Sequence, residues 1–168
     1  MGKKTDTMLS LDLATKKSGL AYWVNDKYIE SYVIDYEKIK DIEQRTISMA
    51  EMLIRALNYF KPSVVYAEDS FKGHNPKTMK YLSRLHGVVM GWCLDHDSEY
   101  QFVMPSSWRK YIPDFPNGRG VKRDTQKEFS VQYVTEKYGF VPKTDDESDA
   151  ILVGEGMIRK LNIVKTNN

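Results

Sequence analysis

The chain has 168 residues, 41% of them hydrophobic and 29% charged, and its 25 basic and 23 acidic residues leave a net charge of +2. This composition is typical of a globular protein, and the length predicts one domain over 1–168. The near-balance of charge excludes a uniformly basic nucleic-acid coat, so any such contact needs a local basic cluster. A single cysteine excludes a disulfide framework, and no apolar run approaches the roughly 18 residues that span a bilayer. We therefore expect an intracellular protein without a membrane partner.

The first third of the chain alternates apolar and polar residues, as half-buried strands do. Three strands are predicted, over 8–15, 18–26 and 27–36, and Asn25-Asp26 is a plausible hairpin turn between the last two. Connections as short as these join antiparallel neighbours. The segment therefore predicts an antiparallel meander of three strands.

The hydrophobic spacing then becomes helical. An amphipathic helix is predicted over 41–60, ended by Pro62, and the nearly all-apolar segment 63–69 predicts a short central strand. The later elements expected are a helix over 77–96, a strand over 100–104, a short helix from Pro105, a basic loop over 113–123, and helices over 124–138 and 145–161. A capping box of Thr144 and Glu147 opens the last helix. The order predicts an α/β fold: a mixed five-stranded sheet, three antiparallel strands and two added by crossover helices, flanked by helices.

Two acidic residues interrupt the apolar pattern of predicted strands. Asp12 lies between Leu11 and Leu13 in the first strand, and Glu68 ends the most apolar strand of the chain. A carboxylate inside a sheet costs several kcal/mol unless it is paired or binds a metal. The alternatives are that Asp12 faces solvent or caps the following turn, and that Glu68 only terminates its strand.

A further group of acids opens the last predicted helix. Asp146 and Asp149 are three residues apart, so they share a helix face. Acids in a first turn also complement the helix dipole, which accounts for Asp145 and Asp146 without any further role. Asp149 differs because it comes directly before the apolar run 150–153, where the helix begins to be buried.

Together these acids predict a metal site. Three or four carboxylates brought together would repel one another strongly without cations, and oxygen-rich sites suit Mg²⁺ or Mn²⁺. Two such ions can activate a water and stabilise the leaving oxygen in phosphodiester cleavage. The three histidines, in contrast, show no metal-ligand spacing.

The chain resembles the RuvC-type Holliday junction resolvases in four segments: DLATKKSGLAYW, VVYAEDSF, PSSWRKY with GRGVKRDTQK, and DDESDAILVGEG. The resemblance runs from about residue 8 to 158, in matching element order. It implies the ribonuclease H-like (integrase-type) fold and a structure-selective endodeoxyribonuclease, a crossover junction endodeoxyribonuclease, that cuts branched DNA. By position it implies that the magnesium-binding catalytic acids, with two ions per site, are Asp12, Glu68, Asp146 and Asp149.

The resemblance also implies how the protein would contact DNA. Phe71 would wedge into the junction and stack on a base near its centre; the alternative is a core residue beneath the loop 72–76. The family uses Lys or Arg to hold the backbone at the scissile phosphate, and Lys122, Arg123 and Lys127 all remain candidates. The DNA-binding set expected here, with a solvated loop as its alternative, is Arg109, Lys110, Arg119, Lys122, Arg123 and Lys127.

The family's dimer helix corresponds to 77–96, where Trp92 and Cys93 are either interface or core residues. A homodimer would present two active sites to a junction of two-fold symmetry. Leu13-Ala14 replaces the family's usual Pro-Gly after the first acid, which indicates a divergent, phage-type member in the cytoplasm of a bacterial or phage-infected cell. Such a member could also cut forks and flaps.

Two other classes of function are alternatives to the nuclease. A non-catalytic nucleic-acid-binding module of the same fold would gain nothing from clustered carboxylates. An actin-like phosphate-binding ATPase also carries an Asp before a turn rich in Thr, Ser and Gly, as in DLATKKSG, but it needs two lobes and a far longer chain. Nicking of a four-way junction with and without magnesium separates these classes.

Overall fold

The computed structural model describes residues 6–69 and 75–166. In chain order the elements are β1 (Thr7–Asp12), β2 (Lys17–Val24), β3 (Lys27–Asp35), α1 (Ile42–Phe60), β4 (Val64–Glu68), α2 (Pro76–Asp95), β5 (Glu99–Val103), α3 (Pro105–Arg109), α4 (Arg123–Tyr138) and α5 (Asp145–Thr166). The order is the one predicted from the sequence. The bounds differ at a few places: β1 already ends at Asp12, α4 begins at Arg123, and α5 continues to Thr166.

The strands form one mixed sheet in the order β3-β2-β1-β4-β5. β1, β2 and β3 pair antiparallel, whereas β4 pairs parallel with β1 and β5 pairs parallel with β4. Asn25 and Asp26 make the predicted hairpin turn, with positive φ angles of 49° and 64°, which Asn and Asp tolerate better than most residues. The predicted fold class is therefore confirmed, including the change from antiparallel to parallel pairing at β1.

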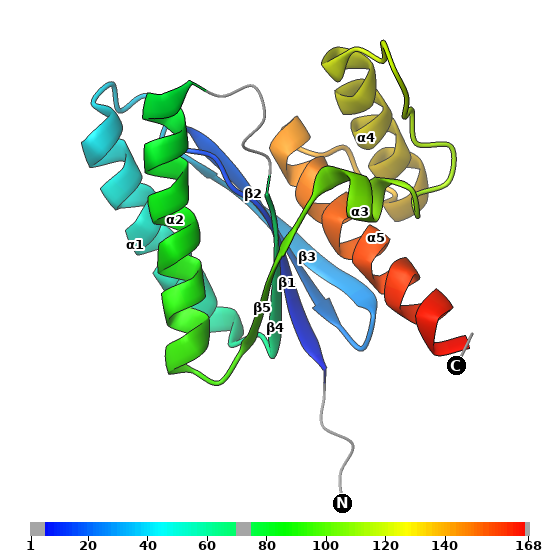
Figure 1. Cartoon of the computed structure of the whole chain (residues 1–168), viewed down its shortest axis with the longest axis horizontal. Coiled ribbons are helices and arrows are strands. Elements are labelled where there is room, and N and C mark those ends of the chain that lie inside the picture. The colour runs from blue at the N-terminus through cyan, green and yellow to red at the C-terminus, as the bar shows by residue number, and fades with distance from the viewer. Residues whose placement is uncertain (1–5, 70–74, 167–168) are drawn as a thin grey trace, which may run out of the picture.

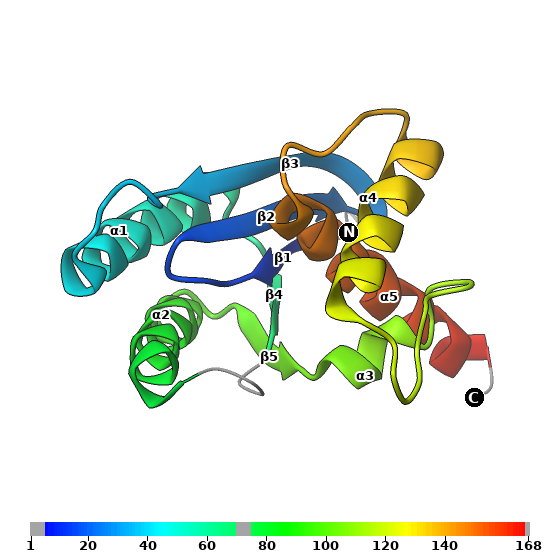
Figure 2. The same ribbon diagram turned by 90° about the horizontal axis from the view of Figure 1, so that it is seen from above.

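Helices cover both faces of this sheet. In Figures 1 and 2, α1 and α2 lie on one side of the sheet, and α3, α4 and α5 lie on the other. The α1–α2 side is built on leucines of the strands and helices, such as Leu9, Leu11, Leu53 and Leu85, each fully buried. Trp92 and Cys93 of α2 belong to this core, so of the two readings left open for them, packing within the chain is the correct one.

The second face of the sheet contains a buried polar network. α5 packs on β1 and β2, and buried polar groups lie among its apolar contacts: Ser10, Ser130, Glu147, Ser148 and Glu155. Ser10 Oγ donates to the Ala150 carbonyl at 2.7 Å and accepts from Trp23 Nε1 at 2.9 Å, so β1, β2 and α5 are joined by a hydrogen-bonded chain inside the core. Such buried networks fix one relative placement of their elements.

The start of α5 differs in detail from the predicted capping box. Thr144 Oγ1 accepts from the Glu147 N–H at 3.3 Å, as expected, but the Glu147 carboxylate accepts from the Lys143 N–H and from Ser31 Oγ, both at 2.6 Å. Glu147 thereby links the first turn of α5 to β3 across the sheet. Among the helices of residues 6–69 and 75–166, none combines the length and the apolar character needed to cross a bilayer.

Candidate active site

Asp12 and Glu68 lie at the same edge of the sheet. β1 and β4 are parallel neighbours in which Leu11 is opposite Ala67, so the next residue of each strand, an acid, comes at the same level. Glu68 is 8% exposed. Burial raises the pKa of Asp12 well above its ordinary value, and the charges of Asp149, Glu68 and Asp146 raise it further. All four predicted catalytic acids therefore act on one another at this edge.

A glycine permits α5 to approach this edge. Gly19 of β2 is paired with Asp12, and a Cβ built on it would lie only 1.9 Å from the backbone oxygen of Asp146. Any side chain at this position would push the first turn of α5 away from the strand. Gly19 is thus the residue that lets Asp146 and Asp149 reach the end of β1. No local sequence pattern predicts this role for Gly19.

The environment of Asp149 raises the pKa of its carboxyl. Burial raises its pKa to about 7, with a further increase from the charge of Glu68, while a hydrogen bond from Ser130 and the charge of Arg109 act in the opposite direction. The pKa of Asp146 is also raised, by burial and then by Asp145, against the charge of Lys127. Raised pKa values of this kind mark places where a structure holds more negative charge than it compensates.

The donor chemistry fits a hard divalent cation, because every predicted ligand is a carboxylate and the nearby Arg109 and Lys127 offset only part of the increase in the pKa of Asp149 and Asp146. The convergence is incomplete, however. Across the described residues 6–69 and 75–166, no three acidic, histidine or cysteine side chains surround a common point as they would around a bound metal. The metal site, and the number of ions in it, therefore stays a prediction.

The short helix α3 supplies two contacts to Glu68. Trp108 is fully buried and donates its indole Nε1–H to Glu68 Oε2 at 2.8 Å, and Arg109 Nη2 lies 3.8 Å from Oε1. The Arg109 guanidinium also lies over the rings of Trp108 and Phe115 and donates to Gln126 Oε1 at 3.2 Å. Arg109, predicted as a DNA contact, therefore has protein partners at the acidic site, whereas Trp108 was missed as a partner of Glu68.

Of the other predicted DNA-binding residues, Lys127 contacts the acidic site. Lys127, on α4, forms an ion pair with Asp145. Lys110, Arg119, Lys122 and Arg123 are exposed, and Arg123 is the first residue of α4 rather than part of the preceding loop. Phe71 lies outside the described residues. Contact of any of these side chains with DNA stays a prediction.

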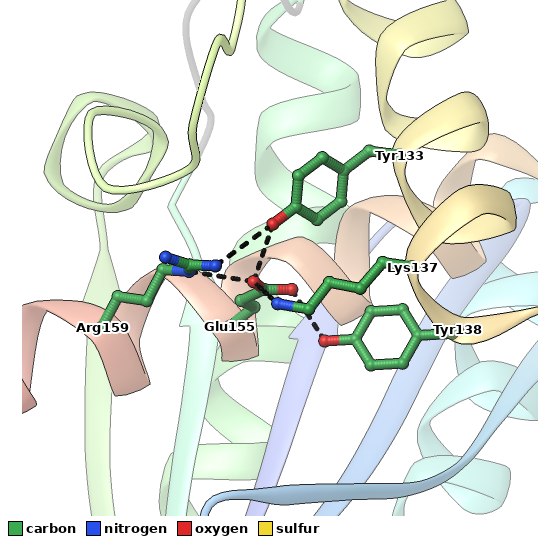
Figure 3. A network of polar contacts seen from close by, with 5 residues as sticks. All are labelled: Tyr133, Lys137, Tyr138, Glu155 and Arg159. Carbon is green, nitrogen blue, oxygen red and sulfur yellow. Dashed lines mark hydrogen bonds and ion pairs between the residues drawn. The ribbon is translucent and has the colours of Figure 1, made fainter.

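A second buried carboxylate joins α4 to α5. Glu155, which is 4% exposed, accepts hydrogen bonds from Tyr133 and Tyr138 hydroxyls at 2.8 and 2.7 Å, from Arg159 Nε at 2.9 Å, and from Lys137 (Figure 3). The contacts between α4 and α5 follow the same order along both helices: Lys127 with Asp145, Ser130 with Asp149, and then the Glu155 network. This network holds α4 in the register that places Ser130 beside Asp149.

No protein-family model matches the sequence, and no curated protein matches it either. The structure of T. thermophilus RuvC in complex with a Holliday junction substrate matches with a TM-score of 0.72 at 12% identity, covering 94% of this chain and 96% of that one.

Two further solved structures match over most of their length. The yeast mitochondrial Holliday junction resolvase Ydc2 has a TM-score of 0.65 at 15% identity, with 96% of this chain and 81% of that chain covered. The fowlpox virus resolvase with its Holliday junction DNA has a TM-score of 0.55 at 16% identity, with 95% and 97% covered. At these identities the likeness is one of fold. The chain has the ribonuclease H-like fold, in the form found in RuvC and other Holliday junction resolvases.

Proposed function

We propose that this protein is a metal-dependent endodeoxyribonuclease that cuts Holliday junctions. The observation that carries the proposal is the placement of the acids at one sheet edge: Asp12 and Glu68 end adjacent parallel strands, and the first turn of α5, with Asp146, lies against Gly19, the pairing partner of Asp12. Burial raises the pKa of Asp12 most, and the charges of Asp149, Glu68 and Asp146 raise it further. The same fold occurs in a RuvC bound to a Holliday junction substrate and in a viral resolvase bound to junction DNA. Site and fold support the same chemistry independently.

Each acid has a role in this proposal. Asp12, Glu68, Asp146 and Asp149 would hold Mg²⁺, with Mn²⁺ as a substitute and two ions per site. The ions, when bound, would activate the attacking water and stabilise the leaving oxygen of the phosphodiester. Ser130 restrains the Asp149 carboxylate by a hydrogen bond, and Lys127 reduces the repulsion between Asp145 and Asp146.

The DNA contacts would come from the basic residues around this edge. Arg109, Lys110, Arg119, Lys122, Arg123 and Lys127 would bind backbone phosphates, which makes affinity dependent on salt. Phe71 would stack on an unpaired base near the junction centre. A homodimer would place two sites on a symmetric four-way junction, and paired nicks would follow. Forks and flaps are included as further substrates.

A nicking assay tests the proposal. Purified protein is incubated with a labelled four-way junction and with a linear duplex of the same sequence, in Mg²⁺, in Mn²⁺ and in EDTA. We expect symmetric nicks in the junction only when metal is present. Asp149→Asn and Glu68→Gln should each lose about 10³-fold in cleavage rate, because several kcal/mol of charge stabilisation is removed, while they still bind the junction.

The same assay identifies the main alternative. Tight junction binding by the wild-type protein without nicking in either metal would indicate a non-catalytic binding module. Equal cleavage of junction and duplex would leave a nuclease but remove its selectivity for branched DNA. The Phe71→Ala variant sharpens the second point, since it should slow junction cutting more than it weakens duplex binding.

A further inference from the structure

Arg109 places a positive charge against the acidic site. Its Nη2 lies 3.8 Å from Glu68 Oε1, which is within the range of an ion pair but beyond hydrogen-bond distance. At Asp149, burial raises the pKa and the charge of Arg109 acts in the opposite direction. One cationic side chain therefore offsets part of the negative charge of two predicted metal ligands, on two different elements.

The hydrogen bonds of this guanidinium are incomplete. Nη1 donates to Gln126 Oε1 at 3.2 Å, whereas the buried Nε–H has no acceptor among the residues that the structure describes. The Arg109 Cζ also lies 5.2 Å from the ring centroid of Trp108 and 5.4 Å from that of Phe115. A buried donor without an acceptor costs free energy. Attraction to the acids and contact with the two rings, and not a full set of hydrogen bonds, therefore hold Arg109 in this position.

A cation and a DNA phosphate would have opposite effects on this arrangement. A divalent cation held by the acids would lie near Arg109, and the two positive charges would repel each other. A phosphate at the same edge would instead attract the guanidinium, because arginine binds phosphate oxygens in a two-pronged contact that supplies acceptors to its N–H groups. The Arg109 side chain is 23% exposed, so a phosphate has access to it.

We propose that Arg109 is a counter-ion built into the acidic site: it opposes metal binding in the DNA-free protein and no longer opposes it when a DNA phosphate takes the guanidinium. This role rests on the proposed function, with Glu68 and Asp149 as metal ligands and DNA as the substrate. The coupling is reciprocal, so DNA raises the affinity for metal and metal raises the affinity for DNA by the same factor. The metal would thus be bound firmly only together with DNA.

Mn²⁺ binding to the DNA-free protein is the first test. Electron paramagnetic resonance gives the Mn²⁺ dissociation constant of the wild type, Arg109→Gln and Arg109→Met, of which the last keeps a long unbranched chain beside Trp108 and Phe115. We expect both neutral variants to bind Mn²⁺ about 5-fold more tightly than the wild type. Arg109→Lys keeps the charge and should bind as weakly as the wild type. A purely structural Arg109 predicts the opposite sign, since a disturbed site binds metal less tightly.

Lys110 provides the matched control for charge. It follows Arg109 directly, is exposed, and places its ammonium 5.1 Å from the ring centroid of Tyr111. Lys110→Gln removes the same formal charge from the same end of α3 and leaves the contact between Arg109 and Glu68 in place. Its Mn²⁺ affinity without DNA should equal that of the wild type. An equal gain of affinity in Lys110→Gln and Arg109→Gln would assign the effect to net charge and overturn the inference.

Junction affinity measures the other side of the coupling. Fluorescence anisotropy of a labelled four-way junction gives the affinity in EDTA and in Ca²⁺, a divalent cation that also prefers oxygen ligands, with the uncut junction confirmed on a gel. We expect Ca²⁺ to raise the junction affinity of the wild type about 5-fold more than that of Arg109→Gln, because only the wild type has a guanidinium to transfer to the phosphate. The same ratio in both proteins overturns the coupling.

The outcomes separate this inference from the proposed function. A wild-type protein that binds no divalent cation, with or without DNA, overturns the nuclease and the inference together. A wild-type protein that binds Mn²⁺ and cuts junctions, with unchanged or weaker Mn²⁺ binding in both neutral variants, overturns the inference alone. Unfolding of Arg109→Gln and Arg109→Met under conditions in which Arg109→Lys folds would assign the charge to the stability of the fold and would also overturn it.

Discussion

Two carboxylates of helix α5, Asp149 and Glu155, have surroundings that are opposite in character. Near its start, burial and the charge of Glu68 raise the pKa of Asp149 to about 7, although Ser130 donates a hydrogen bond to it. Farther along the same helix, burial would also raise the pKa of Glu155, but hydrogen bonds from Lys137, Tyr138, Tyr133 and Arg159 outweigh it and leave the pKa lowered. Burial acts on both carboxyls in the same direction, so the donors around Glu155 account for the opposite shift.

Charge compensation inside the protein distinguishes Glu155 from Asp149. Glu155 is surrounded by two cations and two hydroxyls, so its charge is compensated inside the protein (Figure 3). Asp149 and Asp12 lie among further acids instead, and the charge of Arg109 offsets only part of the increase in the pKa of Asp149. A structure that keeps such a cluster at a cost in stability is expected to use it.

The largest expected effect on stability comes from removing the charge of Glu155. Glu155→Gln leaves Lys137 and Arg159 close together without their anion and should destabilise the fold by about 2–4 kcal/mol, near the lower part of the range for a buried pair because both cations are partly exposed. Urea unfolding at pH 7 measures it. The matched control is Glu136→Gln, the same change at an exposed position of α4. Equal losses of stability in the two variants would mean that Glu155 stabilises the fold no more than an exposed acid does.

Removing the charge of Asp149 should have the opposite effect and raise the stability of the fold. The folded pKa of Asp149, about 7, lies above its ordinary value of 3.8, so folding takes up a proton between these pH values and the wild type loses stability as pH rises through them. At roughly 1.4 kcal/mol per pKa unit the full shift corresponds to about 4 kcal/mol, and solvent screening of this half-buried carboxyl lowers the effect. Asp149→Asn should therefore be more stable than wild type by about 1–3 kcal/mol at pH 8 without metal. The gain should vanish at pH 4. A variant that is less stable than wild type at pH 8 contradicts this account.

Magnesium should reduce this difference in stability between Asp149→Asn and the wild type. If the acids hold the ion, Mg²⁺ at ten times its dissociation constant stabilises the wild type by about 1.4 kcal/mol. Asp149→Asn should gain much less, so the stability difference between the two proteins narrows as Mg²⁺ is added. Thermal melting at pH 8 with increasing MgCl₂, against matched NaCl, measures it. Parallel curves for the two proteins would place any bound Mg²⁺ elsewhere.

The contrast between the two acids also indicates what a sequence can reveal. Asp12 and Glu68 interrupt strongly apolar strands, and such a break in a local pattern is visible in the sequence. Element order and sheet class followed from the change of hydrophobic period in the same way. All of these features depend on residues close together along the chain.

The missed residues depend instead on contacts between distant segments. Gly19 is important because α5 approaches it, and Trp108 because α3 docks on Gly156 below the end of β4. Glu155 lies in a Val-Gly-Glu-Gly stretch, so an acid between two glycines inside a buried run was its only signal. Its partners come from α4, and no local pattern specifies the helix that will face them.

The smallest effect expected concerns residues outside both acid sites. Lys122 and Arg123, at the start of α4, are exposed, so their replacement by Ala should leave stability almost unchanged. If both bind phosphates, the slope of log affinity against log salt for a junction should fall by about 1.8, at roughly 0.9 per phosphate contact. Lys160→Ala with Lys165→Ala removes the same charge toward the far end of α5 and should leave the slope unchanged. Equal slopes for the two double variants would mean that net charge alone drives binding. Lys122 and Arg123 would then make no specific contact with phosphates.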